Sequence, residues 1–353
     1  MWQLDNHTPF AAERTWTRDR DGAELWLVAV RCAFDIAPDG TTSPSDPQPA
    51  VVLIPELVDA GNPAAGLKFD SDLLRTKVTT DVLLHGQAQG QGGRPVTELD
   101  VGFRVGPVVK QLRVIGDRVW CGDSPTPAEP FIRMPLVWGR AYGGYDPASR
   151  AGPSPQWDSR NPAGTGFALS AASADGLKLP NIESPDRPIR HWSDRPEPVG
   201  TGPIPAHWEP RAKLAGTYDA RWQEERFPLL PIDFDDRHYQ SAPPDQQAPR
   251  FLMGGEPVVL VNLTPSGELK FNLPRIHLGL ETFFYTGERR RHEPPRLHSV
   301  ILEPDIPRVS LVWHSALSCH PLTTKLKHTR ITLKQNLNER LGPRSGSESS
   351  QAA

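Results

Sequence analysis

Cysteine is scarce in this chain: its 353 residues include only three, Cys32, Cys121 and Cys319, which lie far apart in the sequence. An odd number of distant cysteines fits neither a disulfide framework nor the paired spacing of a zinc site. The scarcity excludes a small secreted domain held together by disulfides and favours a reducing compartment.

Long apolar runs and an excess of positive charge are also missing. No stretch approaches the roughly 18 apolar residues of a membrane-spanning helix, and the first residues lack the basic and apolar regions of a secretory signal. The formal net charge is −3, whereas a nucleic-acid binder normally has a basic face. We therefore expect a cytoplasmic protein whose partners are neither nucleic acids nor membranes.

The motifs that usually mark catalysis are absent as well. The sequence has no Gly-x-Ser-x-Gly elbow for a nucleophilic serine and no glycine-rich Lys-Ser/Thr loop for phosphates. No two histidines have the four-residue spacing of a zinc-binding helix. We therefore predict a protein that is not an enzyme, with no catalytic residue, no cofactor and no metal.

One acidic stretch, residues 231–238, is a candidate metal site because it places Asp233 and Asp235 beside Arg237. Carboxylate oxygens can hold a divalent cation, but the acidic spacing, central glycine and final glutamate of a calcium-binding loop are missing. Aspartates also cap turns in proline-rich loops. We predict that these three residues organise a structural loop through hydrogen bonds and ion pairs.

Proline and glycine are abundant, at 39 and 29 residues, and this density disfavours long helices. Runs rich in valine, leucine and threonine are separated by turn signals, as in antiparallel β proteins. The expected strands lie at residues 24–36, 77–88, 96–105, 108–115, 256–263, 268–273, 275–285, 296–302, 308–317 and 325–333. The later runs have the spacing of a β-meander, and 24–36 is apolar on both faces, as in an interior strand. We predict a mainly β fold, an antiparallel β-sandwich or barrel-like scaffold with few short helices.

The pattern breaks down in the middle segment, residues 125–250, where proline recurs every few residues. Six of the ten tryptophans lie between positions 120 and 222. We expect this long Pro/Gly/Trp-rich irregular segment to wrap around the β scaffold, with one helical turn near 218–225. The expected organisation is a single domain, 1–335, or two β subdomains, 1–137 and 251–335, joined by 138–250. A Ser/Gly-rich, disordered tail is expected at 336–353.

The most informative motif is residues 138–146, where Trp138, Arg140, Tyr142 and Tyr145 alternate with glycines. Aromatic and arginine side chains dominate binding hot spots, and glycine allows a close approach of two backbones. We predict that these four residues either form a protein-binding surface or directly support one. The competing interpretation is that the glycines only permit a buried turn.

The tryptophans allow a second interpretation. Aromatic platforms with paired carboxylates are typical of glycan-binding or glycan-hydrolysing clefts. The candidates are Trp138, Trp157, Trp192, Trp208, Trp222, Glu183, Asp219 and Asp233. Alternatively, the indole rings hold the irregular segment against the scaffold, because each buries a large apolar area.

The order of motifs along the chain resembles a known family. The matching motifs include Arg140-Ala141-Tyr142-Gly143-Gly144, and lie at residues 6–10, 71–82, 116–120, 134–144, 161–166, 179–183, 208–211, 215–219, 233–235, 242–247 and 254–256. The chain is similar, over about 1–335, to an uncharacterised-domain family found in bacterial type VI secretion gene clusters. The resemblance implies an adaptor, or chaperone, that loads a toxic effector with a PAAR-like tip protein onto the secretion spike. It implies no catalytic residues.

Overall fold

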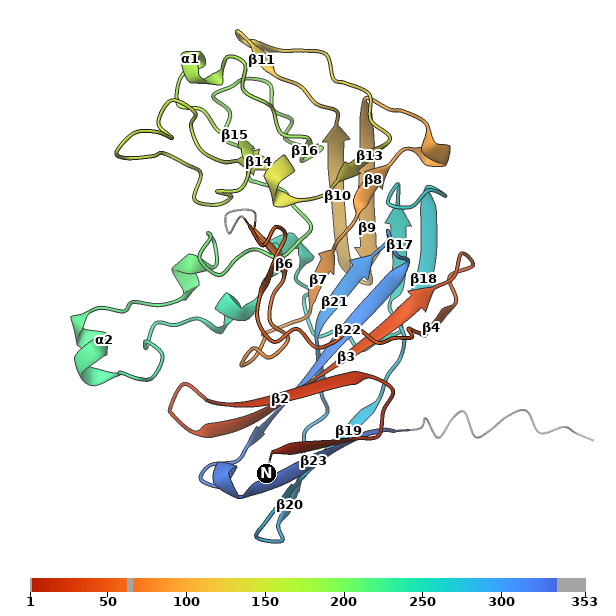
Figure 1. The fold of residues 1–353 in the computed structure, drawn as a ribbon, viewed down its shortest axis with the longest axis vertical. Coiled ribbons are helices and arrows are strands. Elements are labelled where there is room, and N and C mark those ends of the chain that lie inside the picture. The colour runs from red at the N-terminus through yellow and green to blue at the C-terminus, as the bar shows by residue number, and fades with distance from the viewer. Residues whose placement is uncertain (1, 62–65, 335–353) are drawn as a thin grey trace, which may run out of the picture.

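β-Strands dominate the computed structural model, which describes residues 2–61 and 66–334 (Figure 1). The described residues contain two short α-helices, α1 (Ala171–Ala174) and α2 (Ala220–Glu225). Helix α2 begins where the Asp219 carboxylate accepts a hydrogen bond from the Trp222 N–H, an N-cap inside the predicted 218–225 turn. The mainly β prediction is confirmed, whereas the tail expected at 336–353 lies outside the described residues.

The largest sheet has six strands, and its central strands are buried on both faces. Its strands are β2 (Ala11–Arg18), β3 (Glu24–Ile36), β22 (Arg308–Ser318), β21 (Arg296–Glu303) and β7 (Asp81–Leu84), with β4 (Thr42–Pro44) on β3. Trp26 and Val28 face the main core, whereas Val312 and Ile301 pack against Ala242 of the middle segment on the other side. Cover on both faces explains why β3 is mostly apolar on both sides, with only Glu24, Arg31 and Asp35 charged.

Two smaller sheets and four two-stranded ribbons complete the β structure. The five-stranded sheet is β16 (Ile182–Glu183), β10 (Val108–Ile115), β9 (Glu98–Val105), β17 (Pro257–Val261) and β18 (Glu268–Asn272). The four-stranded sheet is β1 (Gln3–Asn6), β23 (Leu326–Leu333), β19 (Leu278–Phe284) and β20 (Arg289–Arg291). The ribbons are β5 (Glu56–Leu57) with β6 (Leu67–Phe69), β8 (Gln87–Gln89) with β13 (Arg133–Pro135), β11 (Trp120–Cys121) with β12 (Ser124–Pro125), and β14 (Tyr142–Gly143) with β15 (Thr165–Gly166).

Short 3₁₀ turns connect these strands. They are η2 (Gln91–Gly93), η3 (Trp138–Arg140), η4 (Ala212–Leu214), η5 (Asp236–Tyr239), η6 (Pro244–Gln246) and η7 (Thr323–Lys325). No described helix has the length and apolar character needed to cross a membrane.

The strand order differs from the expected meander. The consecutive hairpins β17–β18, β19–β20 and β21–β22 enter three different sheets, so the meander prediction was wrong. Strands from the first part of the chain join each hairpin's sheet: β9 pairs with β17, β3 with β22, and β1 runs parallel to β23. Strands from before and after the middle segment therefore share sheets, and none of the sheets in the described part of the chain closes into a barrel.

The predicted long strand at 77–88 is also interrupted. Strand β7 runs parallel to β21, and β8 then pairs with β13 in a separate ribbon. At the end of β7 the Leu84 N–H donates to the carbonyl of Thr201, whereas the His85 N–H still donates to the carbonyl of Leu302 on β21. Gly86 then lies so close to Pro304 that a Cβ would be 2.7 Å from its ring, and its carbonyl accepts from the Leu136 N–H, next to β13. The chain therefore changes partners after His85.

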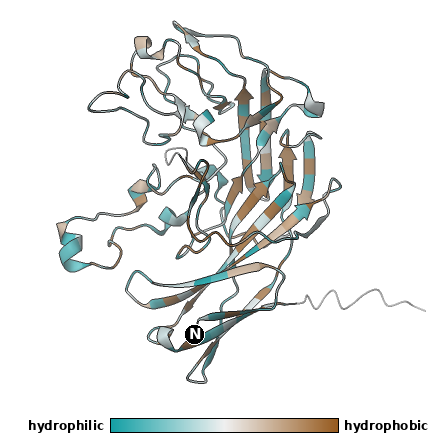
Figure 2. Cartoon of the chain, viewed as in Figure 1, coloured by the Kyte–Doolittle hydropathy of each residue, from teal (hydrophilic) through white to brown (hydrophobic). Residues whose placement is uncertain are grey.

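The middle segment lies along one side of the strands and has a small core of its own (Figure 1). Tyr142, Ala168 and Leu179 are buried there together with Trp120 of β11, separately from the main core. Hydrophobic residues are concentrated in the central strands, whereas hydrophobic and hydrophilic residues alternate along the middle segment (Figure 2). Side chains, rather than long ladders, therefore order this part of the chain.

Candidate functional site

Trp138 anchors the glycine-rich motif to the main core. Its side chain is buried, and its indole N–H donates to the carbonyl oxygens of Gly202 at 3.2 Å and Pro203 at 3.1 Å. The ring packs edge to face on Trp208, with 6.2 Å between centroids. Trp138 therefore fixes the motif to the core, and its buried side chain is not exposed to a partner.

Tyr142 is buried as well and joins the motif to a second glycine-rich stretch. Strand β14 pairs in parallel with β15, and the buried Asn161 amide donates to the carbonyls of Trp138 at 2.9 Å and Tyr142 at 3.0 Å. Burial raises the pKa of Tyr142 to about 12, so its hydroxyl stays protonated. Tyr142 has a framework role rather than a contact role.

Arg140 and Asp146 are engaged within the chain. The Arg140 guanidinium donates to the Asn181 side-chain oxygen at 2.8 Å, and Asp117 lies 3.4 Å away. Burial acts to raise the pKa of Asp146, but hydrogen bonds from the Leu169 N–H, Ser173 and Ser149 together hold that pKa below its ordinary value. Both side chains fix the turns around the motif.

A cleft of about 530 Å³ opens between residues 139–147 and 162–166, and five glycines contribute to its lining. Gly143 and Gly144 are required sterically, because each has a positive φ and lies close to a backbone oxygen. Gly139 differs: a Cβ there would meet only the Ala163 oxygen at 3.6 Å. The backbone does not demand glycine at 139, so the missing side chain serves to keep this wall of the cleft open.

One edge of this cleft carries aromatic and cationic groups: Tyr145 and Arg150 belong to its lining, and Trp157 packs on Tyr145 from outside the lining. Tyr145 packs on Trp157 with 5.6 Å between ring centroids, and 48% of the Trp157 surface is exposed. The Arg150 guanidinium lies 5.8 Å from the Tyr145 ring centroid, and among the described residues it has no acidic partner. We call Tyr145, Arg150 and Trp157 the rim residues. Trp157 and Arg150 are exposed and Tyr145 is half-buried, so the surface they form is aromatic and cationic.

Of the four predicted contact residues, only Tyr145 belongs to this rim. Trp138 and Tyr142 are buried, and Arg140 is half-buried in its own hydrogen bonds. Sequence reasoning missed Arg150 and the special position of Gly139. Arg150 could have been found from the sequence, because it is a positively charged residue that follows Tyr145 by one short turn.

The acidic stretch forms a loop held by its own side chains. The Asp233 carboxylate accepts hydrogen bonds from the Thr217 N–H at 3.0 Å and hydroxyl at 2.8 Å. Asp235 caps η5 and accepts from the backbone and side-chain N–H groups of Arg237. These hydrogen bonds lower the pKa of both aspartates. Within residues 2–61 and 66–334, no three His, Cys, Asp or Glu side chains gather to hold a metal ion.

The residues proposed for a glycan cleft occupy separate places. Trp138 and Trp208 lie in the main core, and the buried Glu183 carboxylate pairs with Arg118 at 2.6 Å. Only Trp222, Asp219 and Asp233 share a cavity, of about 520 Å³. The two aspartates of that cavity already accept hydrogen bonds from Trp222 and Thr217.

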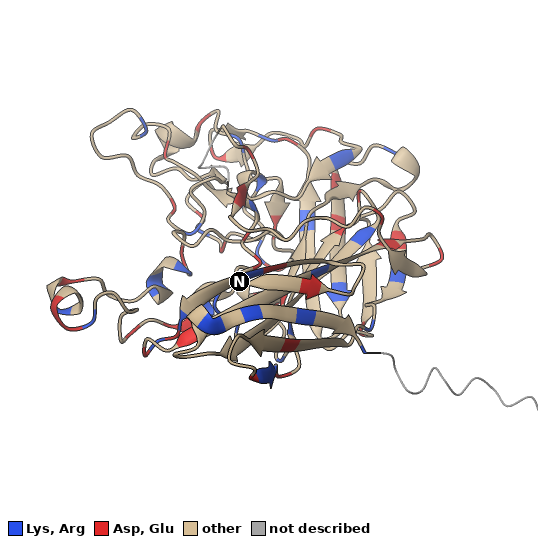
Figure 3. Cartoon of the chain, turned by 60° about the horizontal axis from the view of Figure 1, so that its bottom comes forward, with Lys and Arg blue, Asp and Glu red and all other residues tan. Residues whose placement is uncertain are grey.

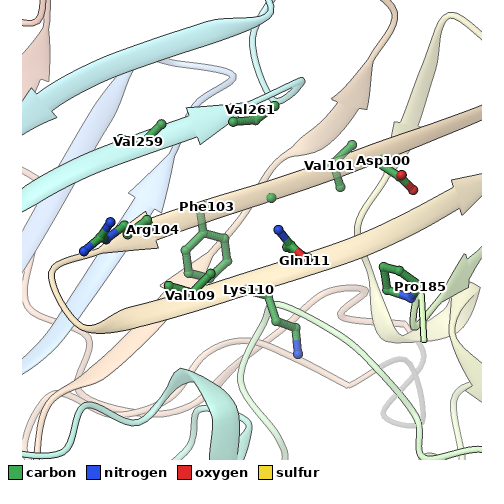
Figure 4. A pocket seen from close by; sticks show the side chains of 11 residues that line it. Asp100, Val101, Phe103, Arg104, Val109, Lys110, Gln111, Pro185, Val259 and Val261 are labelled. Carbon is green, nitrogen blue, oxygen red and sulfur yellow. The ribbon is translucent and has the colours of Figure 1, made fainter. Parts of the chain in front are cut away.

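A third hollow lies on the outer face of the five-stranded sheet (Figure 4). It measures about 270 Å³ and is centred near Gly102 between β9, β10 and β17. Val109 and Val261 are exposed beside it, while Lys110 of the same strand turns to the opposite face and pairs with Asp245 at 2.7 Å. This surface is shallow and shows no feature that selects a partner.

Fold and cleft together define a mainly β scaffold that carries a glycine-lined cleft on an irregular segment. The profile of a family described as "Uncharacterized protein conserved in bacteria (DUF2169)" matches residues 21–314. Because the match covers well over half of the chain, the protein belongs to this bacterial family. Comparisons with curated proteins and with solved structures found no match.

Proposed function

We propose that this protein is a non-enzymatic adaptor of a type VI secretion system. It binds a toxic effector together with a PAAR-like tip protein in the bacterial cytoplasm and loads them onto the secretion spike. The order of motifs described above, which resembles that of secretion-cluster adaptors, supports this proposal. The DUF2169 match agrees with a bacterial origin.

The observation that carries the proposal is the rim around the glycine-lined cleft. Trp157 is about half exposed although it packs on Tyr145, and Arg150 lies over the same Tyr145 ring. Such groups are held in place before a partner arrives, so little side-chain entropy is lost on binding. Tyrosine, tryptophan and arginine are also the residue types that dominate hot spots.

The cleft itself suits a segment of a partner protein. Five of its lining residues are glycines, and where they form the wall another main chain can approach closely. Arg150 at the mouth can donate two hydrogen bonds to a carboxylate. An effector segment that enters the cleft would be held by main-chain contacts, with the aromatic rim covering it.

The test is binding of the purified chain to the toxin encoded beside its gene. We expect Trp157→Ala and Arg150→Glu each to weaken this binding at least tenfold, which is about 1.4 kcal/mol. Trp16→Ala and Arg94→Glu are matched controls, since both residues are exposed outside the cleft. If the rim variants bind the effector as tightly as the control variants, the cleft is not part of the binding surface. If the wild-type chain does not bind the effector, the adaptor proposal is wrong.

The glycan alternative has one supporting observation, the cavity shared by Trp222, Asp219 and Asp233. A glycan array and a polysaccharide hydrolysis assay distinguish it from the adaptor. Saturable sugar binding that Trp222→Ala abolishes, without any effector binding, would favour the glycan function.

A further inference from the structure

Residues 216–233 form a lobe that projects away from the strands, with α2 at its tip (Figures 1 and 3). We call this the α2 lobe. Its base is closed by the hydrogen bonds from Thr217 to the Asp233 carboxylate. Gly216, with φ +80°, lets the two arms cross there, because a Cβ would lie 2.9 Å from Pro231. The lobe is therefore a closed unit rather than a loose loop.

The interior of the α2 lobe is organised around Trp222. Its ring meets Tyr218 and Phe227 edge to face, at centroid distances of 4.8 Å and 5.6 Å. The indole N–H donates to the carbonyl of Leu229 at 2.8 Å. Arg226 ties the lobe to the body by donating to the carbonyl of Arg20. These contacts hold the lobe in one conformation.

The outer surface of the lobe exposes three large side chains with apolar surface. The exposed fractions are 53% for Tyr218, 65% for Phe227 and 72% for Ile232. Tyr218 and Phe227 both contact the Trp222 ring, and Ile232 lines the same cavity as Trp222, so the three exposed side chains gather around that ring. A rigid, projecting patch of this kind marks an interaction surface.

Charge on the lobe indicates what kind of surface it meets. It carries four acidic residues, Asp219, Glu224, Glu225 and Asp233, against the arginines 221 and 226. Arg221 pairs with Glu225 at 3.0 Å, and Arg226 donates to backbone carbonyls. An acidic border disfavours an anionic membrane surface and favours a basic one.

We propose that the α2 lobe is a second docking element, which inserts into an apolar groove bordered by lysine or arginine side chains on a partner protein. The inference rests on the proposed function, in which one adaptor holds two proteins. The lobe and the cleft are lined by different residues, so each surface can serve a different protein. Binding at the lobe buries Phe227 and Ile232 and places Glu224 beside the basic border.

The experiment uses the full chain with the purified effector and, separately, the purified PAAR-like tip protein. Ile232→Ser removes the most exposed apolar contact of the lobe, and Ile54→Ser is its matched control, at 74% exposed. Glu224→Lys reverses the border charge, and Glu129→Lys is the control at another exposed position. Dissociation constants and melting temperatures are measured for all variants.

We expect both lobe variants to weaken binding of one of the two proteins at least tenfold, with unchanged melting temperature and unaffected controls. The effect of Glu224→Lys should shrink as salt is raised. If the wild-type chain binds its partners and the lobe variants bind equally well, the lobe proposal is wrong and the adaptor proposal stands. If the wild-type chain binds neither protein, both proposals fall.

Three further assays test other occupants of the lobe. They are sedimentation with phosphatidylglycerol vesicles, light scattering for self-association, and the glycan array. Loss of any of these interactions in Ile232→Ser, with partner binding unchanged, would overturn the assignment to a protein groove.

Discussion

The β scaffold and the middle segment of this protein are ordered by different means. In the scaffold, β3 pairs with β22 over eleven residues, from Arg308 opposite Asp35 to Ser318 opposite Leu25. In the middle segment the longest described ladder is the three-residue pairing of β13 with β8, and β14 pairs with β15 over only two residues. There, buried side chains such as Trp138 and Asn161 supply the hydrogen bonds that ladders supply elsewhere. Order in a long irregular segment is thus concentrated in a few residues.

Acid should give the largest effect, and it acts on the scaffold. Burial, as the largest cause, lowers the pKa of His85, His292 and His314 to about 4 from an ordinary 6.5. The unfolded chain therefore binds more protons between pH 6.5 and 4, so the free energy of unfolding falls as pH falls through that window. At pH 5 the loss should be about 2 kcal/mol for each histidine. Urea unfolding at pH 7.5 and pH 5 measures it.

His85 provides the control for that experiment. Its ring packs edge-on against Phe69, 4.8 Å away, and the nearby cations Lys68 and Arg31 add to the effect of burial in lowering its pKa. We expect His85→Leu to show a smaller difference between pH 7.5 and pH 5 than the wild-type chain. If the free energy of unfolding of His85→Leu changes between pH 7.5 and pH 5 as much as that of the wild-type chain, His85 does not cause the acid sensitivity.

The next effect tests whether the middle segment depends on single residues as strongly as the scaffold does. Trp138→Ala should lower the free energy of unfolding by about 3–5 kcal/mol, because a large ring and its hydrogen bonds are lost from a packed site. Trp26→Ala, on β3, is the matched scaffold variant, since Trp26 is also buried and donates to the Thr329 hydroxyl at 2.9 Å. If Trp138→Ala loses less than about 1 kcal/mol while Trp26→Ala loses more, the middle segment does not depend on single residues as the scaffold does.

Asn161→Ala is expected to have an intermediate effect. It removes two donors and leaves the buried carbonyls of Trp138 and Tyr142 without their partners, which costs about 2–3 kcal/mol. Asn272→Ala, at an exposed position on β18, should change stability by less than about 0.5 kcal/mol. Chemical denaturation of both variants checks the difference.

The smallest effect should come from the rim. Trp157→Ala should alter the free energy of unfolding by no more than about 1 kcal/mol, because half of the ring already faces solvent. A large loss of stability would show that Trp157 belongs to the framework. The rim would then have no separate role in contact.

Local pattern predicted the scaffold strands well, because alternation and turn residues act within a few positions. The predicted bounds 24–36 and 108–115 are those of β3 and β10. Which strands pair could not be predicted, since β3 and β22 meet across most of the chain. The site was harder still: Trp138 and Trp157 look alike in the sequence, yet one is buried and the other exposed. That difference depends on neighbours such as Trp208, which are remote in sequence.

The shared sheets have a consequence for how the protein is made. Strand β3 ends at Ile36, and its partner β22 begins at Arg308. At a synthesis rate of 5–20 residues per second, β3 leaves the ribosome roughly 15 to 60 seconds before β22 exists. During that interval this long, mostly apolar strand has only β2 and β4 beside it. The unfinished chain therefore exposes an apolar strand edge of the kind that promotes aggregation and that molecular chaperones cover.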